Sequence, residues 1–128
     1  MTDRRRRYRA LVVEDDRAIR ELVKVVLERE GFMVEAVREA TSAIELLRTV
    51  QYDLLILDLI LPVVGGEKVL TFLSDARPAT LRRVILTTAS PRQLSCEFLE
   101  RICTLLEKPF DIEALVLIAR ECASGEAA

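Results

Sequence analysis

Short apolar segments alternate with amphipathic segments along this chain. Five apolar segments have the length of strands, and their hydrophobic residues follow one another without alternation, as in strands that are buried on both faces. These segments are residues 10–13, 32–36, 54–57, 84–87 and 102–106. The segments between them place apolar side chains three and four residues apart, which indicates helices with one buried face.

Start and stop signals set the bounds of these helices. The first spans residues 17–30 and ends at Gly31, because glycine readily adopts the conformation that follows a helix. The second spans 41–49, and the third follows Gly66 and ends before Pro78. The fourth, at 91–100, has the weakest pattern. The fifth begins at Asp111, a good N-cap residue, and runs to Cys122.

This regular alternation of strands and helices predicts an α/β fold. We expect a doubly wound, five-stranded parallel sheet with helices on both faces. One domain would span residues 9–122, between a basic N-terminal tail at 1–8 and a C-terminal tail at 123–128. In such a sheet, ligands bind at the carboxyl ends of the strands, near the point where the strand order reverses.

Composition and charge narrow the class of protein. The chain has 128 residues, 51% of them hydrophobic and 31% charged, which is typical of a folded soluble domain. No apolar run is long enough to span a membrane and no signal-peptide pattern is present, so we expect a cytoplasmic protein without membrane contact. Five of the 19 basic residues are arginines among the first nine positions, so the body of the chain is acidic and direct DNA binding is not expected.

The cysteines and the missing histidine exclude several kinds of chemistry. Cys96, Cys103 and Cys122 form no C-x-x-C pair, and the chain contains no histidine that could complete a zinc site. We therefore expect buried free thiols in a reducing compartment. The absence of histidine also excludes Ser-His and Cys-His catalysis.

Polar residues stand where four of the predicted strands end. Glu14 and Asp15 follow the first strand, Asp58 the third and Thr88 the fourth, and Lys108 stands two residues after the fifth. Each alone has an ordinary explanation, but on a parallel sheet they would meet at one edge. Crowded carboxylates repel one another, and a divalent cation held by oxygen ligands, such as Mg²⁺, would relieve the repulsion. Asp58 could then accept a phosphoryl group, with Lys108 and Thr88 stabilising its charge.

Four segments resemble, in order and spacing, the receiver domain of bacterial two-component response regulators. They are LVVEDD at 11–16, LLILDLILP at 54–62, VILTTA at 84–89 and EKPF at 107–110, and the resemblance covers about residues 9–122. It implies a CheY-like, flavodoxin-like fold that takes a phosphoryl group from a sensor histidine kinase or a phosphotransfer protein. Partners would be that donor and a downstream effector protein, and the chain would catalyse only its own phosphorylation and dephosphorylation.

The resemblance also implies a metal site. Asp15 would bind Mg²⁺ directly and Glu14 through water. Asp58 and the backbone carbonyl of Ile60 would also be metal ligands. Asp16 matches no metal ligand, and we interpret it as a helix cap.

The phosphoryl pocket follows from the same resemblance. Asp58 would be the phosphoacceptor, with Leu59 lining the pocket and Lys108 contacting the phosphoryl group. Thr88 rather than Thr87 matches the switch hydroxyl, because the small Ala89 follows it and would leave room for the group. Pro109 stands where the family often has a cis peptide bond.

Two features depart from the family pattern. The switch position three residues before Lys108 is often Tyr or Phe in the family, whereas here it is Leu105. The segment from Thr88 to Lys108 also looks slightly shorter than usual, so we expect a short or irregular fourth helix.

Several alternatives stay open. The fold could serve as a pseudo-receiver whose partner binding does not depend on phosphorylation. An aspartate-based phosphatase is disfavoured, because Ile60 stands where such enzymes need a second Asp, and a flavin site is disfavoured by the acidic loop after the first strand. Val116 and Leu117 give the fifth helix extra apolar residues. They indicate either a partner face, including a homodimer through helix 4, strand 5 and helix 5, or a more buried helix.

Overall fold

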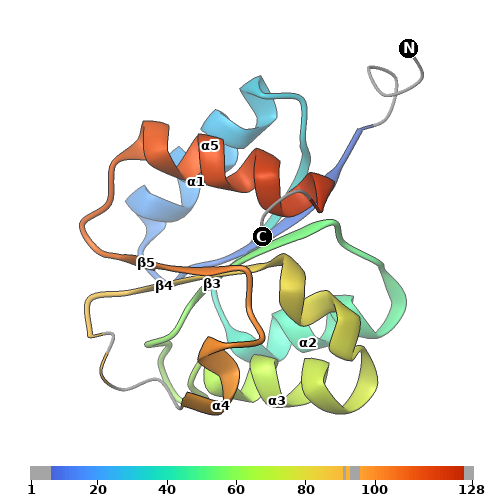
Figure 1. The fold of residues 1–128 in the computed structure, drawn as a ribbon. Helices are drawn as coiled ribbons and strands as arrows, with labels where there is room; N and C mark the ends of the chain where they lie inside the picture. Colours follow the sequence, from blue (N-terminus) through green and yellow to red (C-terminus); the bar gives the residue numbers. More distant parts are fainter. Residues whose placement is uncertain (1–6, 91, 93–95, 126–128) are drawn as a thin grey trace.

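The computed structural model describes residues 7–90, 92 and 96–125. In chain order its elements are β1 (Arg9–Val13), α1 (Arg17–Arg29), β2 (Met33–Val37), α2 (Ala40–Thr49), β3 (Leu54–Asp58), α3 (Glu67–Ala76), η2 (Pro78–Arg83), β4 (Val84–Thr88), α4 (Cys96–Leu99), β5 (Thr104–Glu107) and α5 (Ile112–Ser124). All neighbouring strands pair in parallel, in the order β2-β1-β3-β4-β5. Helices α1 and α5 cover one face of the sheet, and α2, α3 and α4 cover the other (Figure 1). The predicted doubly wound fold is confirmed.

The hydrophobic core has two layers, one on each face of the sheet. Successive side chains of a strand point to opposite faces, so one central strand supplies both layers. In β1, Leu11 and Val13 belong to the layer under α2 and α3, and Ala10 and Val12 belong to the layer under α1 and α5. This two-sided burial explains why the central strands are apolar without alternation.

Strand β5 and the 3₁₀ helix η2 differ from the sequence prediction. Strand β5 begins at Thr104, two residues later than predicted, because the amide of Ile102 still donates to the carbonyl of Phe98 in the turn after α4. The 3₁₀ helix η2 was not predicted. It begins at Pro78, which in the sequence marks only the end of the third helix, although proline also suits the first turn of a helix.

The fourth helix is described mainly in the second half of its predicted range, so its predicted shortness stays a prediction. Helix α4 covers Cys96–Leu99 and contributes the buried Phe98 to the core. Residues 91 and 93–95 of the predicted helix lie outside the described residues.

The two ends of the domain extend beyond the predicted bounds. Tyr8 contacts the ring of Phe32, with centroids 6.1 Å apart, and its carbonyl accepts from the amide of Met33 at 2.8 Å, so position 8 packs with the domain. Helix α5 continues to Ser124 rather than ending at Cys122, and Gly125 closes it with φ of 81°. The remaining tail residues, 1–6 and 126–128, lie outside the described residues.

Helix α5 keeps apolar surface exposed. Leu117 is 65% exposed, and Val116 is partly exposed. Within the described residues the chain therefore leaves Leu117 uncovered, so deeper burial of the helix does not explain that residue. None of the described helices combines the length and apolar character needed to cross a bilayer.

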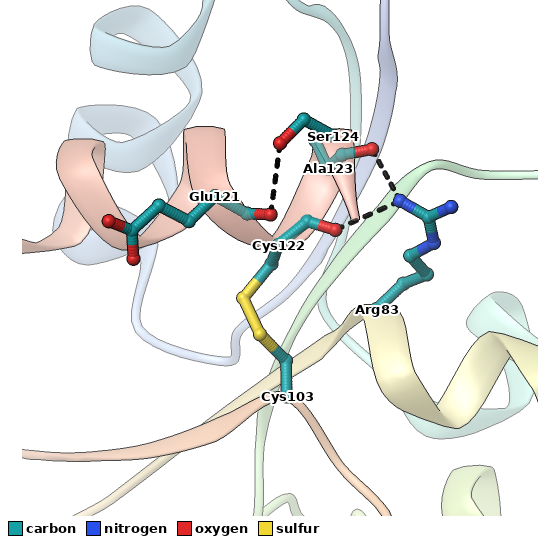
Figure 2. Close-up of a disulfide and its surroundings, with 6 residues drawn as sticks. All are labelled: Arg83, Cys103, Glu121, Cys122, Ala123 and Ser124. Atoms are coloured by element: carbon teal, nitrogen blue, oxygen red, sulfur yellow. Dashed lines mark hydrogen bonds between the residues drawn. A yellow bond between two sulfur atoms is a disulfide. The ribbon is translucent and has the colours of Figure 1, made fainter. Parts of the chain in front are cut away.

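The prediction of free thiols is wrong for two cysteines. Cys103 and Cys122 form a disulfide that joins the start of β5 to the last turn of α5 (Figure 2). Their sequence separation of 19 matches no short motif, because a strand, a loop and a helix lie between them. The inference of a reducing compartment, which depended on free thiols, loses its support. The side chain of Cys96 lies outside the described part.

Candidate functional site

Two carboxylates and one ammonium group meet at the carboxyl edge of the sheet. Asp58 is the last residue of β3, Glu14 directly follows the adjacent β1, and Lys108 directly follows β5. The Lys108 Nζ lies 2.8 Å from Glu14 Oε1 and 3.1 Å from Asp58 Oδ2. Both carboxylates are buried, with Glu14 4% and Asp58 5% exposed. The predicted convergence of these three residues is observed, at the point where the strand order reverses.

Backbone amides fix the other oxygens of the two carboxylates. The amide of Ile60 donates to Asp58 Oδ1 at 3.1 Å, and the amide of Asp16 donates to Glu14 Oε2 at 3.0 Å. Each carboxylate therefore has one bond to Lys108 and one to its own loop, which sets its orientation. Asp16 also accepts from the amide of Ile19 at 3.1 Å, so its predicted role as the cap of α1 is confirmed.

Burial and charge raise two pKa values at this edge. The pKa of Asp58 lies above its ordinary value, chiefly because burial disfavours the carboxylate and because the charge of Glu14 repels it. Lys108 and the Ile60 amide oppose this rise. Burial lowers the pKa of Lys108, but its bonds to Glu14 and Asp58 outweigh burial and leave that pKa raised. The ammonium group therefore stays charged at neutral pH and holds the two carboxylates together.

The raised pKa of Asp58 predicts an effect on stability. A carboxyl group whose pKa is higher in the folded state costs stability as the pH rises through that folded pKa. We expect Asp58→Asn, which removes the charge and keeps the size, to raise the free energy of unfolding at neutral pH by about 1 kcal/mol. The gain should shrink as the pH falls below the folded pKa. Urea unfolding of Asp58→Asn and of the unmodified chain, from acidic to neutral pH, measures this difference in the free energy of unfolding. Asp75→Asn, on the exposed surface of α3, is the control. A loss of stability at neutral pH would contradict the prediction.

Thr88 joins the site through its backbone. Its carbonyl accepts from the amide of Lys108 at 2.9 Å, and its fully buried hydroxyl accepts from the amide of Ser90 at 2.9 Å. Because the hydroxyl accepts in that bond, its own proton remains available for donation. The hydroxyl of Thr87 instead donates to the carbonyl of Leu57 on β3, at 3.5 Å. The switch role of Thr88 stays a prediction.

The remaining predicted residues surround this centre in different ways. Leu59 is buried and its amide donates to the carbonyl of Thr87 at 2.9 Å, whereas Ala89 is exposed. Ile60 is 49% exposed beside Asp58. Leu105 is partly buried and packs against the core layer under α2 and α3. The Lys108–Pro109 peptide bond is cis, as the resemblance implied.

The three predicted metal-binding carboxylates are not equally placed. Glu14 and Asp58 share Lys108, whereas Asp15 is exposed. The described residues contain no group of three or more acidic, histidine or cysteine side chains arranged to hold a metal ion. Mg²⁺ in proteins often uses one or two carboxylates and keeps several waters, so the oxygen donors of Glu14 and Asp58 fit this ion without a complete cage.

Two residues that the sequence did not single out shape the site. The guanidinium of Arg20 donates to the carbonyls of Glu14 and Asp15, at 2.9 and 3.2 Å, and so holds the acidic loop. Gly66 lies against the backbone of β3, because its amide donates to the carbonyl of Leu59 at 2.8 Å. The sequence pattern gives Gly66 only as the residue before the third helix, because its close approach to β3 depends on the fold.

We expect Gly66→Ala to destabilise the domain by about 2–3 kcal/mol. A Cβ at this position would lie 2.3 Å from the carbonyl oxygen of Asp58 and 2.9 Å from the Cα of Leu59, and both are backbone atoms that cannot rotate away. Gly65→Ala is the matched control, because its Cβ would lie 4.0 Å from the nearest atom, the carbonyl oxygen of Leu59. Urea unfolding compares the two variants. Equal stabilities would show that the loop accommodates the methyl group.

Comparison with known proteins decides the family. The family model of the response regulator receiver domain matches residues 10–120. The chain belongs to the response regulator receiver domain family. This receiver domain is 36% identical over 114 residues to Protein PetR of Rhodobacter capsulatus, an alignment that covers 84% of the chain and 45% of PetR. The receiver domain thus spans less than half the length of PetR.

Solved structures agree with the family and the fold. A CheY-like response regulator receiver domain from Methylobacillus flagellatus is 30% identical with a TM-score of 0.79, and the match covers 91% of this receiver domain and 99% of that chain. The receiver domain of the sensor histidine kinase PA1611 from Pseudomonas aeruginosa is 23% identical with a TM-score of 0.80, and the match covers 93% and 99%. The latter structure has a magnesium ion coordinated in the active site cleft. At 23% identity, this second likeness shows only the shared fold.

Proposed function

We propose that this receiver domain accepts a phosphoryl group on Asp58 in a Mg²⁺-dependent reaction and that the phosphorylated form binds its partners differently. One observation carries the proposal: the buried Asp58 carboxylate at the sheet edge is held together with Glu14 by the single ammonium group of Lys108. Burying two carboxylates and a cation at the ends of the strands costs free energy of desolvation. Such a group therefore indicates a functional site.

The transfer follows from the groups around Asp58. A carboxylate oxygen of Asp58 attacks the phosphorus atom, and the bond between phosphorus and the donor's leaving group breaks. When the donor is a phosphohistidine of a sensor kinase or a phosphotransfer protein, the imidazole nitrogen leaves with the bonding electrons. Lys108 is already 3.1 Å from Asp58 Oδ2, so its charge can stabilise the phosphoryl oxygens as they approach. Thr88 would donate its hydroxyl proton to one of these oxygens.

The same edge would hold the metal ion. Asp58 and Asp15 would bind Mg²⁺ directly, Glu14 would bind it through water, and Ile60 would contribute its carbonyl. The bound ion would supply positive charge that orients the phosphoryl group and lowers the repulsion between it and the carboxylates. The magnesium ion in the PA1611 receiver domain, which shares this fold, supports this part of the proposal.

Intact-protein mass spectrometry tests this function. The receiver domain is incubated with acetyl phosphate, a small acyl phosphate, in the presence of Mg²⁺ or of EDTA. We expect a phosphoryl mass increment only with Mg²⁺. No increment with acetyl phosphate, nor with a phosphoramidate as a second donor, would refute the proposal.

A pseudo-receiver is the second candidate function. Leu105 and the shortened segment between Thr88 and Lys108 favour it, because both depart from the pattern through which the family usually announces phosphorylation. In a working switch, phosphorylation shifts the population between two conformations.

Hydrogen exchange distinguishes these two candidates. If the switch works, we expect phosphorylation to change amide exchange in the segment from β4 to β5 by about threefold or more, because an opening equilibrium responds to a fraction of a kcal/mol. Exchange is measured by mass spectrometry with and without acetyl phosphate. Phosphorylated protein with unchanged exchange across this segment would favour the pseudo-receiver.

Partners and location belong to the same proposal. A sensor histidine kinase or a phosphotransfer protein would be the donor, and a downstream effector would bind the face formed by α4, β5 and α5. Leu99 of α4 and Leu117 of α5 are exposed, at 41% and 65%. The same face could support a homodimer. A protein that receives its signal from a kinase's phosphohistidine would work in the cytoplasm, and its only catalysis would be its own phosphorylation and dephosphorylation.

A further inference from the structure

We propose that the disulfide between Cys103 and Cys122 is reversible, that Cys103 is the sulfur that exchanges with small disulfides such as oxidised glutathione, and that the bond limits movement of β5 and α5. The regulatory part of this inference rests on the proposed function, because it concerns how phosphorylation at Asp58 reaches the partner face.

The disulfide joins the residue before β5 to the last turn of α5. Cys103 directly precedes β5, and its amide donates to the carbonyl of Val84 at 2.9 Å. Cys122 lies in the last turn of α5, with its Cα 6.2 Å from that of Cys103 (Figure 2). Arg83 donates to the carbonyls of Cys122 and Ala123, so a cation and a covalent bond hold the same turn.

The loop closed by this bond contains part of the site. It includes β5, Lys108 and most of α5, and Lys108 contacts both Glu14 and Asp58. Strand β5 is an edge strand without a buried residue, as is β2 at the opposite edge, whereas every residue of β3 and β4 is buried. An edge strand with little burial depends more on a cross-link, so the bond should matter most for the strand that carries Lys108.

Exposure of the two cysteines sets the order of the exchange. Cys103 is partly exposed, whereas Cys122 is 1% exposed. The Cys103 thiolate attacks one sulfur of the small disulfide, forms a mixed disulfide and releases one thiolate. The Cys122 thiolate then attacks the Cys103 sulfur and releases the second. In total, the two protein thiols lose two electrons and two protons. The small disulfide gains them and is released as two thiols.

Graded ratios of reduced to oxidised glutathione test the exchange in the full chain. At each ratio, free thiols are trapped with an alkylating agent and located by peptide mass spectrometry. We expect Cys103 and Cys122 to become alkylated together as the ratio rises, and glutathione to appear on Cys103 in a Cys122→Ser variant. Pairing of either residue with Cys96, no glutathione on Cys103 in the Cys122→Ser variant, or a bond that stays closed at every ratio would overturn the inference.

Stability and exchange measure the consequence of the bond. Reduction of the disulfide should lower the Tm by about 10 °C, because it removes the stabilisation gained by closing a loop of this size. Phosphorylation should change amide exchange in β5 and α5 about threefold more in the reduced protein than in the oxidised one. Because Cys122 is buried, Cys103→Ser is the preferred variant for opening the bond. It should behave like the reduced protein. Cys96→Ser is the control. If phosphorylation changes amide exchange equally in the oxidised and in the reduced protein, the regulatory part is overturned.

The two proposals fail in distinguishable ways. The mass increment on Asp58 is recorded in the same samples, so its absence in both redox states would refute the proposed function together with the regulatory part. In either case, alkylation tests whether the disulfide is reversible.

Discussion

Asp58→Asn is expected to reduce phosphoryl incorporation from acetyl phosphate and Mg²⁺ by more than about 100-fold, because an amide cannot replace a carboxylate as nucleophile. The substitution keeps the size and the contact of Asp58 Oδ1 with the amide of Ile60, so the fold should persist. Intact-protein mass spectrometry over time measures the incorporation.

The control for this variant is Asp75→Asn on the exposed surface of α3, which should incorporate phosphoryl groups at the rate of the unmodified chain. Urea unfolding checks that both variants are folded. Substantial incorporation into folded Asp58→Asn would show that another residue is the acceptor.

Lys108→Ala should slow phosphoryl transfer by about 100- to 1,000-fold, which is typical for the loss of one group that stabilises transition-state charge. The variant removes the cation that contacts both Glu14 and Asp58. Loss of its charge also removes one of the causes that lower the pKa of Asp58, so that pKa should rise further. The rate should therefore fall more steeply at acidic pH than in the unmodified chain. Stopped time courses at several pH values measure both effects.

Lys68→Ala, on the exposed surface of α3, is the matched control, because it removes the same charge from an exposed side chain. Mg²⁺ binding, followed by isothermal titration calorimetry, gives a second measurement. It should be at least as tight in Lys108→Ala, because Lys108 and the ion compete for the same carboxylates. A rate equal to that of the Lys68→Ala variant would remove Lys108 from the mechanism.

The fold and the centre of the site could be predicted from the sequence for one physical reason. Strands buried on both faces read as continuous apolar runs, and parallel strands end at one edge, so Glu14, Asp58 and Lys108 had to converge there. The fixed period of the helices and the caps at Asp16 and Asp111 similarly marked the helix starts.

Features that depend on packing between distant segments could not be predicted. The disulfide joins Cys103 and Cys122 only because α5 packs beside β5, and linear spacing gives no sign of this. The close approach of Gly66 to the carbonyl of Asp58 depends on how α3 meets β3. The exposure of Asp15 could not be predicted either, because it follows from the shape of a loop rather than from the end of a strand.

Peptide-level localisation of the phosphoryl group, after labelling with acetyl phosphate in Mg²⁺ and in EDTA, tests most directly whether Asp58 is a metal-dependent phosphoacceptor. We predict a single modified site, Asp58, in the Mg²⁺ sample and no modification in the EDTA sample. A folded protein that carries the group on another residue, that carries it equally in EDTA, or that carries none would contradict this mechanism.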